Sequence, residues 1–477
     1  MPARSSISRR EALAALVPGA MALRAQSTPP KNVLFILADD LNTSLSIYGN
    51  KVVKTPNFER LARMGVTFDR AYCQYPLCQP SRTSLLSGLR PATTKVYTLD
   101  TPTRQTIGGA MMLPELFRNH GYFTAHAGKI YHTGDDAEDP RSWDIEVREK
   151  GKTPPKKEIL EASTAKGPKG HTFDWDILKT ADADMPDGAV VHQTIEWLEA
   201  RARDKKPFFI GNGFRRPHAP YAAPKKYYDL YSTENIPLPK TSPEEFRRLI
   251  PAAVNFDPPD KPLTDLEVRQ QIRAYYACVS FVDAQLGLLL DAMDRLKLWD
   301  NTIVTLSVDH GYLLGEHGGM WHKMSLFEEA TRIPMIAVTP HMPNAGKHCA
   351  GLVESVDLYP TLAELCGLTG PANLEGLSFR PLLDHPDRAW KRGAFSTQGR
   401  GQERGESAND IQFLGHTVRT ERWRYTEWDG GKQGIELYDK VADPREVENL
   451  AGRPQMKKEQ AMLQSMLHAG WKSALPA

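Results

Sequence analysis

The feature that most constrains the fold of this chain is a largely apolar run that ends in acidic residues, and it occurs twice. NVLFILADD ends in Asp39 and Asp40, and TLSVDHG, more than two hundred residues later, contains Asp309 and His310 at its end. Strands that are buried on both faces have such continuous apolar runs, and they belong to parallel sheets covered by helices. The two runs therefore predict two central strands of a parallel sheet.

Helical patterns alternate with these runs and with two further short apolar runs, FFIGNGF and PMIAVTP. The clearest helix is predicted from about 267 to 297, where apolar residues recur at steps of three and four. Shorter helices are predicted near 58–64, 113–120, 190–203 and 357–366. This alternating order predicts an α/β fold with a largely parallel sheet flanked by helices. Ligands in such folds bind beyond the carboxyl ends of the strands.

The pattern changes after about Pro381. HTVRTERWRYTEW alternates as antiparallel strands do, and IELYDKVADP follows a glycine-rich turn. We therefore predict a catalytic domain over 28–380 and a smaller C-terminal subdomain with an antiparallel sheet over 381–477. The polar segment 135–170, which contains KTPPKKE and KGPKG, is predicted to be a long surface excursion.

The first 25 residues have the pattern of an export signal. Arg9 and Arg10 precede the apolar stretch ALAALVPGAMAL, and Ala20-Met21-Ala22 offers a small-residue cleavage site. The arginine pair resembles a twin-arginine signal, although Ala12 stands where that pattern usually has phenylalanine. Residues 1–25 are therefore interpreted as a removable signal, and the mature protein is expected in the periplasm or outside the cell.

Composition excludes two classes of partner. The 60 basic and 58 acidic side chains give a net charge of +2, and no basic block with interleaved aromatic residues appears, so a nucleic acid is not expected. No apolar run reaches the ~20 residues of a membrane-spanning helix. The cysteines are expected to be mostly buried thiols, with one disulfide allowed after export; they are Cys73, Cys78, Cys278, Cys349 and Cys366.

The segment Cys78-Gln79-Pro80-Ser81-Arg82, followed by TSLLSG, is the most informative for chemistry. Its pattern places Cys78 at the first turn of a helix, where free N–H groups and the helix dipole favour anions. A thiol in that position is expected to have a lowered pKa and to act as a nucleophile. Two doublets of potential ligands, Asp39-Asp40 and Asp309-His310, lie at the carboxyl ends of two central strands and would converge on one hard cation.

The pentapeptide, with Gly88 ten residues after Cys78, resembles the signature of the formylglycine-dependent sulfatases of the alkaline-phosphatase superfamily. The segments RRPHAPY, K-M-S-x-F-E and G-K-I-Y-H-T-G most resemble the iduronate-2-sulfatase branch of that family. The resemblance implies an alkaline-phosphatase-like fold. It also implies that a formylglycine-generating enzyme oxidises Cys78 to formylglycine (3-oxoalanine), whose hydrate is the nucleophile, and that Arg82 holds this hydrate.

The resemblance also implies the remaining site residues. Calcium, with magnesium as the alternative, would be bound by Asp39, Asp40, Asp309, His310 and the modified Cys78. In GYFTAHAGKIYHTG, Lys129 and His132 would contact the hydrate, and His132 would be the base that releases sulfate. His218 in RRPHAPY and Lys323 in the K-M-S-x-F-E segment would bind sulfate and stabilise charge on the leaving oxygen, with His317 and His322 as competitors for Lys323.

The predicted function is therefore hydrolysis of a sulfate ester, and the expected substrate is a sulfated saccharide. Arg215, Arg216 and Lys225, near His218, are candidates to meet a uronate carboxylate. Choline sulfate is the competing substrate; it would need an aromatic or acidic cage, for which Tyr312 and Trp321 are the candidates.

Two other classes of function remain as alternatives. A phosphodiesterase or phosphonate monoester hydrolase of the same superfamily would share the Asp39-Asp40 and Asp309-His310 doublets and could even share the modified cysteine. A binding protein on a decayed sulfatase fold would be expected to have lost at least one of the chemical residues, and all are present in this chain.

Overall fold

The computed structural model describes residues 31–132, 139–148, 158–163, 174–256, 262–401 and 410–476. The predicted export signal, 1–25, lies outside the described residues. Lys31–Ala477 form one compact unit. The predicted domain boundary at 380/381 stays a prediction.

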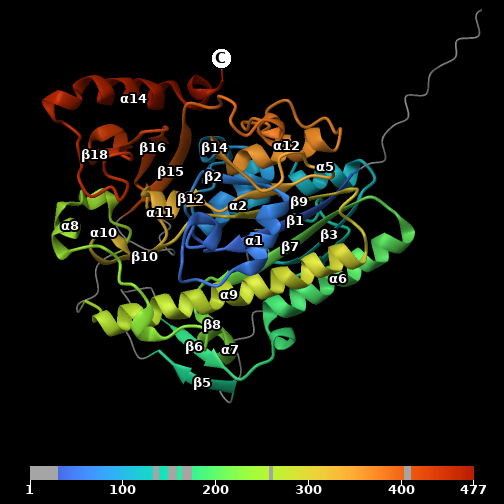
Figure 1. The fold of residues 1–477 in the computed structure, drawn as a ribbon. Helices are drawn as coiled ribbons and strands as arrows, with labels where there is room; N and C mark the ends of the chain where they lie inside the picture. Colours follow the sequence, from blue (N-terminus) through green and yellow to red (C-terminus); the bar gives the residue numbers. More distant parts are fainter. Residues whose placement is uncertain are drawn as a thin grey trace, which may run out of the picture. The chain divides into compact units, whose positions relative to one another are not determined.

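The centre of this unit is a nine-stranded, mostly parallel sheet (Figure 1). The strands predicted to be central, β1 (Asn32–Asp39) and β9 (Thr302–Val308), are fully buried and pair in parallel with each other. In spatial order the strands are β12 (Arg332–Ile333), β2 (Val66–Tyr72), β13 (Ile336–Val338), β9 (Thr302–Val308), β1 (Asn32–Asp39), β7 (Phe208–Pro217), β3 (Phe123–Gly128) and β4 (Ile145–Val147), with β14 (Lys347–Glu354) also paired to β2. Antiparallel pairing is confined to β12 and β13 among the described strands of this sheet.

Helices cover both faces of the sheet, as the alternating sequence predicts (Figure 1). On one face lie α1 (Pro56–Met64), α6 (Pro186–Asp204) and α9 (Asp265–Arg295), and on the other α2 (Cys78–Ser87), α5 (Leu113–Asn119) and α12 (Leu358–Leu365). The predicted helices near 58–64, 113–120, 190–203, 267–297 and 357–366 are confirmed. The α/β fold with a largely parallel central sheet is confirmed as well.

The longest helix, α9, begins at a capping box, in which the Thr264 hydroxyl accepts from the Glu267 amide and the Glu267 carboxylate accepts from the Thr264 amide. By length and composition α9 alone, among the described helices, would be able to cross a membrane. However, 83% of its most apolar window is buried inside the protein, which identifies it as a core helix.

A four-stranded antiparallel sheet, β15 to β18 in sequence order, forms the C-terminal part and confirms the predicted change of pattern. Its strands are β15 (Ala394–Arg400), β16 (Phe413–Arg419), β17 (Trp423–Trp428) and β18 (Gly434–Asp439). Helix α14 (Lys457–Ala469) packs on this sheet, with Leu463 buried against Val418, Tyr425 and Leu437.

Shorter elements fill the connections. They are α3 (Pro91–Thr94), α4 (Thr103–Ile107), α7 (Lys225–Tyr228), α8 (Pro243–Arg248), α10 (Glu316–Gly319), α11 (Glu328–Thr331), α13 (Arg380–Asp384), β10 (Leu313–Gly315) and β11 (Met320–His322), together with a small sheet of β5 (Ile159–Ala162), β6 (Trp175–Leu178) and β8 (Tyr221–Pro224).

The predicted surface excursion, 135–170, is largely exposed where it is described, in β4 and in β5 (Ile159–Ala162). Trp143 is the exception that composition did not predict: it is buried against the core, and the following strand, β4, extends the main sheet beside β3. The expectation of mostly buried thiols is confirmed: all five cysteines are free, and only Cys366 is partly exposed.

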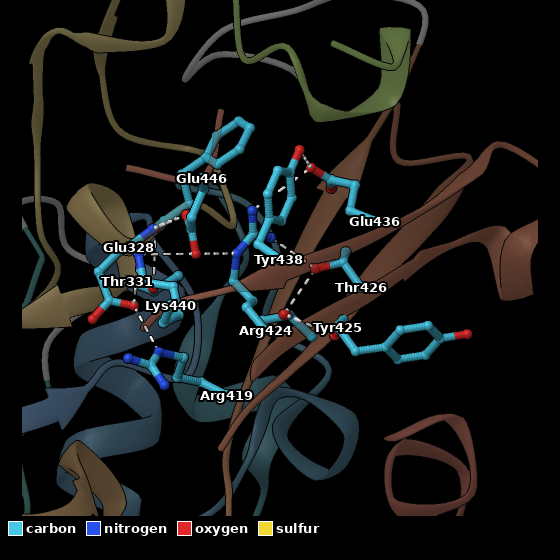
Figure 2. Close-up of polar contacts among 12 residues, drawn as sticks. Glu328, Thr331, Arg419, Arg424, Tyr425, Thr426, Glu436, Tyr438, Lys440 and Glu446 are labelled. Carbon is cyan, nitrogen blue, oxygen red and sulfur yellow. Dashed lines mark hydrogen bonds and ion pairs between the residues drawn. The ribbon is translucent and has the colours of Figure 1, made fainter. Parts of the chain in front are cut away.

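A buried ionic network joins the C-terminal sheet to α11, the short helix that follows Lys323 in the sequence (Figure 2). Arg424 on β17 donates to Glu446 at 2.7 Å, and Lys440 lies 3.3 Å from the same carboxylate. Glu446 in turn accepts from the amide of Glu328, at 3.0 Å. Burial alone would raise the pKa of Glu446, but Arg424 and Lys440 outweigh it and hold that pKa well below its usual range.

Replacing Glu446 by glutamine is expected to lower the free energy of unfolding by about 3–5 kcal/mol, because two buried cations, Arg424 and Lys440, lose their nearest counter-charge. A lowered carboxylate pKa stabilises the fold at neutral pH, and this contribution is lost as the pH falls below about 4, the ordinary glutamate value. The difference between wild type and variant in urea unfolding should therefore shrink on acidification.

The matched control is Asp229→Asn, which breaks the exposed Lys225–Asp229 pair and should cost less than about 1 kcal/mol. A Glu446→Gln cost as small as that of the control would contradict the role given to this network.

Candidate active site

The register of the central strands brings the Asp39-Asp40 and Asp309-His310 doublets together. Ala38 on β1 lies opposite Val308 on β9, so the residues that follow each strand emerge side by side at one edge of the sheet. Asp39 and Asp40 follow on β1, and Asp40 has a left-handed backbone, with φ of 59°. Cys78 is the first residue of α2, as predicted, and this helix end points at the same edge.

Four side chains meet there. Ligand atoms of Asp39, Asp40, Cys78 and His310 lie within 4.8 Å of one another, and all four residues are buried. The Cys78 sulfur is 3.4 Å from both Asp39 Oδ1 and His310 Nε2. His310 Nδ1 is 2.9 Å from the Gly311 carbonyl, so Nε2 is the nitrogen that faces the group.

Asp309, the fifth predicted ligand, lies at the edge of this group. Its Oδ2 accepts from Arg82 Nε at 2.9 Å and is 3.6 Å from His310 Nε2. Arg82 also donates to the carbonyls of Lys129 and Ile130. Arg82 therefore fixes Asp309 and the segment after β3 relative to α2.

Three cations balance the carboxylates. Lys129 Nζ pairs with Asp39, and Lys323 Nζ lies 2.7 Å from Asp40 Oδ1. Lys323 Nζ is also 3.2 Å from the Cys78 sulfur, and Arg82 is 3.5 Å from Asp39. Burial would raise the pKa of Asp39, but the surrounding positive groups, Lys129 foremost, hold it well below its usual value.

The predicted lowering of the Cys78 pKa is wrong for the thiol in this structure. Burial raises the pKa of Cys78 well above its usual value, and Asp39 adds to the rise, although Lys129 and Lys323 oppose it. The helix end and the lysines favour a thiolate, but removal from water and the adjacent carboxylate outweigh them. The sequence alone does not reveal that the first turn of α2 is fully buried.

The two predicted histidines lie around this centre. His218 follows β7; its Nε2 is 3.9 Å from Asp40 Oδ2, and its Nδ1 is 2.6 Å from the Ala219 carbonyl. Burial and the positive charge of Lys129 lower the pKa of His132 to about 3, so its imidazole is neutral at physiological pH. Burial likewise lowers the pKa of His310. All predicted site residues are therefore brought to one region.

The two competitors of Lys323 are turned elsewhere. His317 pairs with Glu329 at 3.0 Å and stacks on Phe327. His322 Nδ1 lies 2.5 Å from the Tyr312 hydroxyl. Only Lys323, of these three, reaches the Cys78 sulfur within hydrogen-bonding distance in the described structure.

Two supporting residues were missed by sequence analysis. Tyr275 on α9 donates to the Asp40 carbonyl at 2.7 Å and accepts from the Asn42 amide at 2.8 Å. Asn255 donates to the carbonyls of Trp321 and Lys323, at 2.6 and 2.7 Å. Tyr275 reads as one more apolar position of a helix, and Asn255 has no motif around it, so neither carries a signal in the sequence.

The candidate substrate residues are reassigned by their contacts. Arg216 is buried and donates to the carbonyls of Ala222 and His218, at 2.9 Å each, so it supports the His218 loop. Lys225 pairs with Asp229. Tyr312 is fully buried and its hydroxyl is hydrogen-bonded to the Tyr221 hydroxyl, so it does not line an open cage for a quaternary ammonium group.

A cavity of about 490 Å³ lies beside the Lys323 segment. Its lining is largely apolar and aromatic; it includes Phe246, Asn255, Phe256, Leu263, Trp321 and His322. This volume lies in the range that holds small organic ligands.

The side chains present fit a divalent cation. Two carboxylates and one imidazole converge, and the Cys78 sulfur stands where an oxygen of the oxidised residue would lie. Hard cations prefer such carboxylate oxygens, and the histidine has its second nitrogen occupied, as metal-bound histidines usually do. Lys129 and Lys323 pair with the same two carboxylates.

Comparison with known proteins agrees with this geometry. The profile of the Sulfatase family matches residues 31–368, and that of the N-sulphoglucosamine sulphohydrolase C-terminal family matches 315–472. A sulfatase of Formosa agariphila is 36% identical over 91% of this chain and 86% of its own length. Human iduronate 2-sulfatase is 32% identical, over 85% of this chain and 86% of its own length.

The fold also matches a solved phosphonate monoester hydrolase of Silicibacter pomeroyi, with a TM-score of 0.78 at 22% identity, over 93% of this chain and 96% of that one. That likeness concerns the fold alone. The family match covers most of the chain and includes all ten predicted site residues. This chain therefore belongs to the Sulfatase family, within the alkaline-phosphatase-like superfamily, and is a sulfuric ester hydrolase.

Proposed function

We propose that this sulfatase releases sulfate from a sulfated saccharide, with residue 78 as formylglycine and a divalent cation held by Asp39, Asp40, His310 and residue 78. The observation that carries the proposal is the surroundings of Cys78. Its sulfur lies within 3.4 Å of a carboxylate, an imidazole and the Lys323 ammonium at once.

Each implied group would add one kind of chemistry. A bound cation would withdraw negative charge from the sulfate oxygens, and the hydrate formed when water adds to formylglycine would place a nucleophilic hydroxyl where the thiol lies. Asp309 would complete or support the cation site through its contact with His310.

The chain's own cations would hold the sulfate. A sulfate monoester is an anion, so its approach to this carboxylate-rich edge needs positive charge in a site shielded from water. Lys129 and Lys323 supply it, and both ammonium groups are buried. Lys323 Nζ, 3.2 Å from the reacting position of residue 78, is placed to stabilise the leaving oxygen.

The histidines would handle protons. The Nδ1 atom of His132 is buried and has no hydrogen-bond partner among the residues the structure describes, so its position leaves it open to accept a proton. His218 Nε2, on the side of Asp40, would contact the sulfate or the leaving oxygen.

The saccharide is proposed from the relatives and from the cavity. The human relative is named for iduronate 2-sulfate, and the cavity beside Lys323 has the aromatic lining that sugar rings pack against. Choline sulfate is the weaker candidate: Trp321 lines the cavity, but Tyr312, the other candidate for an aromatic cage, is fully buried.

Cys78→Ala is expected to abolish sulfate release while leaving the unfolding curve close to that of wild type, because one small buried side chain is shortened. Cys78→Ser should be equally inactive in a host that does not convert serine. Sulfate should be measured by ion chromatography, with the state of residue 78 read by peptide mass spectrometry. Normal sulfate release by the alanine variant would refute the role of residue 78.

Chelation is expected to remove activity, and calcium should restore it better than zinc, because the site offers mainly carboxylate oxygens. Asp40→Asn should weaken calcium binding more than Asp309→Asn, since Asp40 belongs to the four-atom group and Asp309 pairs with Arg82. A supporting residue typically changes metal affinity by about 10- to 100-fold. Equal calcium affinities of the two variants, by titration calorimetry, would count against the assigned ligand set.

The expected substrate order is a sulfated saccharide, such as a 2-O-sulfated uronate, ahead of choline sulfate. A phosphonate monoester of a matched alcohol should be a poorer substrate than its sulfate ester, which separates the proposal from the phosphonate hydrolase alternative. The measurement is kcat/KM for each compound. A higher value on choline sulfate than on every saccharide tested would overturn the saccharide assignment.

A further inference from the structure

Lys323 sits in an unusual stretch of backbone. The residues on both sides of it have left-handed conformations, with φ of 68° at His322 and 61° at Met324. Neither residue is glycine, and side chains rarely adopt this conformation. Such backbone persists only where the surrounding structure holds it in place.

Asn255 is the first of the groups that hold it. Its Nδ2 donates to the carbonyls of Trp321 and Lys323, at 2.6 and 2.7 Å. Its Oδ1 accepts from the Phe256 amide at 3.0 Å, so both ends of the carboxamide are used and its orientation is fixed.

Arg400 is the second, and it comes from the C-terminal sheet. As the last residue of β15, it donates through one terminal nitrogen to the Met324 carbonyl at 2.9 Å and through Nε to the Ala252 carbonyl at 2.9 Å. Its guanidinium lies 4.7 Å over the ring of Trp428, which is fully buried. The Arg400 side chain therefore links the backbone next to Lys323 to the backbone at Ala252, shortly before Asn255.

The C-terminal sheet is itself firmly attached. Figure 2 shows Glu446 bridging Arg424 on β17 and the amide of Glu328, at the start of α11. On the other side, the Met324 amide donates to the Pro76 carbonyl at 2.9 Å, two residues before Cys78. Hydrogen bonds of Met324 thus connect the backbone next to Lys323 to the turn before Cys78 on one side and to the C-terminal sheet on the other.

We propose that Arg400 is a positioning residue for Lys323. Through the Met324 carbonyl directly, and through Ala252 and Asn255 indirectly, it keeps the strained backbone in the one arrangement that places Lys323 Nζ beside residue 78. The inference rests on the proposed role of Lys323 at the leaving oxygen. It makes the C-terminal sheet a working part of the active site.

The test compares Arg400→Lys with wild type on phenyl sulfate and on 4-nitrophenyl sulfate. Lysine keeps the charge but lacks the planar fork that reaches two carbonyls together. A displaced Lys323 should slow a poor leaving group most, so kcat should fall about 10- to 100-fold on phenyl sulfate and much less on 4-nitrophenyl sulfate. Asn255→Ala should give the same pattern if Arg400→Lys fails to fold.

Two reference variants separate the explanations. Lys323→Met should show the same leaving-group dependence more strongly. Arg90→Lys disrupts a buried pair with Glu354, away from Cys78, and should lower thermal stability while slowing both esters equally.

If Lys323→Met shows the dependence but Arg400→Lys and Asn255→Ala behave like Arg90→Lys, the positioning role is wrong and the proposed function stands. If Lys323→Met itself shows no dependence, the proposed role of Lys323 fails, and the role of Arg400 fails with it.

Discussion

The structure depends on the parallel pairing of β1 and β9, because that pairing places Asp39, Asp40, Asp309 and His310 together at the buried carboxyl ends of these strands. Carboxylates crowded together and removed from water would normally be protonated or repel each other. Here Lys129, Lys323 and Arg82 lie close enough to keep Asp39 ionised. A sulfate anion and a metal cation would bind among these same charged groups.

Much of this arrangement was predictable from the sequence, for a simple reason. A buried parallel strand reads as a continuous apolar run, and its carboxyl end is where ligands bind, so NVLFILADD and TLSVDHG located both halves of the centre. The long helix α9 was equally clear, because apolar residues recur along it at steps of three and four. The sequence pattern around Cys78 predicted the helix whose first turn faces Asp39 and His310.

What the sequence did not predict depends on contacts between distant segments. The helix end at Cys78 suggested a lowered thiol pKa, but complete burial beside Asp39 raises it. Arg216 looked like a substrate contact and instead supports the His218 loop. Asn255 and Arg400 approach Lys323 from segments about 70 residues away on either side, so no local pattern marks them. The export signal stays a prediction, since it lies outside the described residues.

The central claim is that turnover occurs at residue 78 only after its oxidation, within the group formed by Asp39, Asp40 and His310. The most direct measurement uses preparations made with increasing amounts of formylglycine-generating enzyme. In each, the fraction of residue 78 present as the aldehyde is quantified by peptide mass spectrometry and compared with the rate of sulfate release. The account predicts a straight line through the origin. Substantial sulfate release from protein in which residue 78 is entirely cysteine would contradict it.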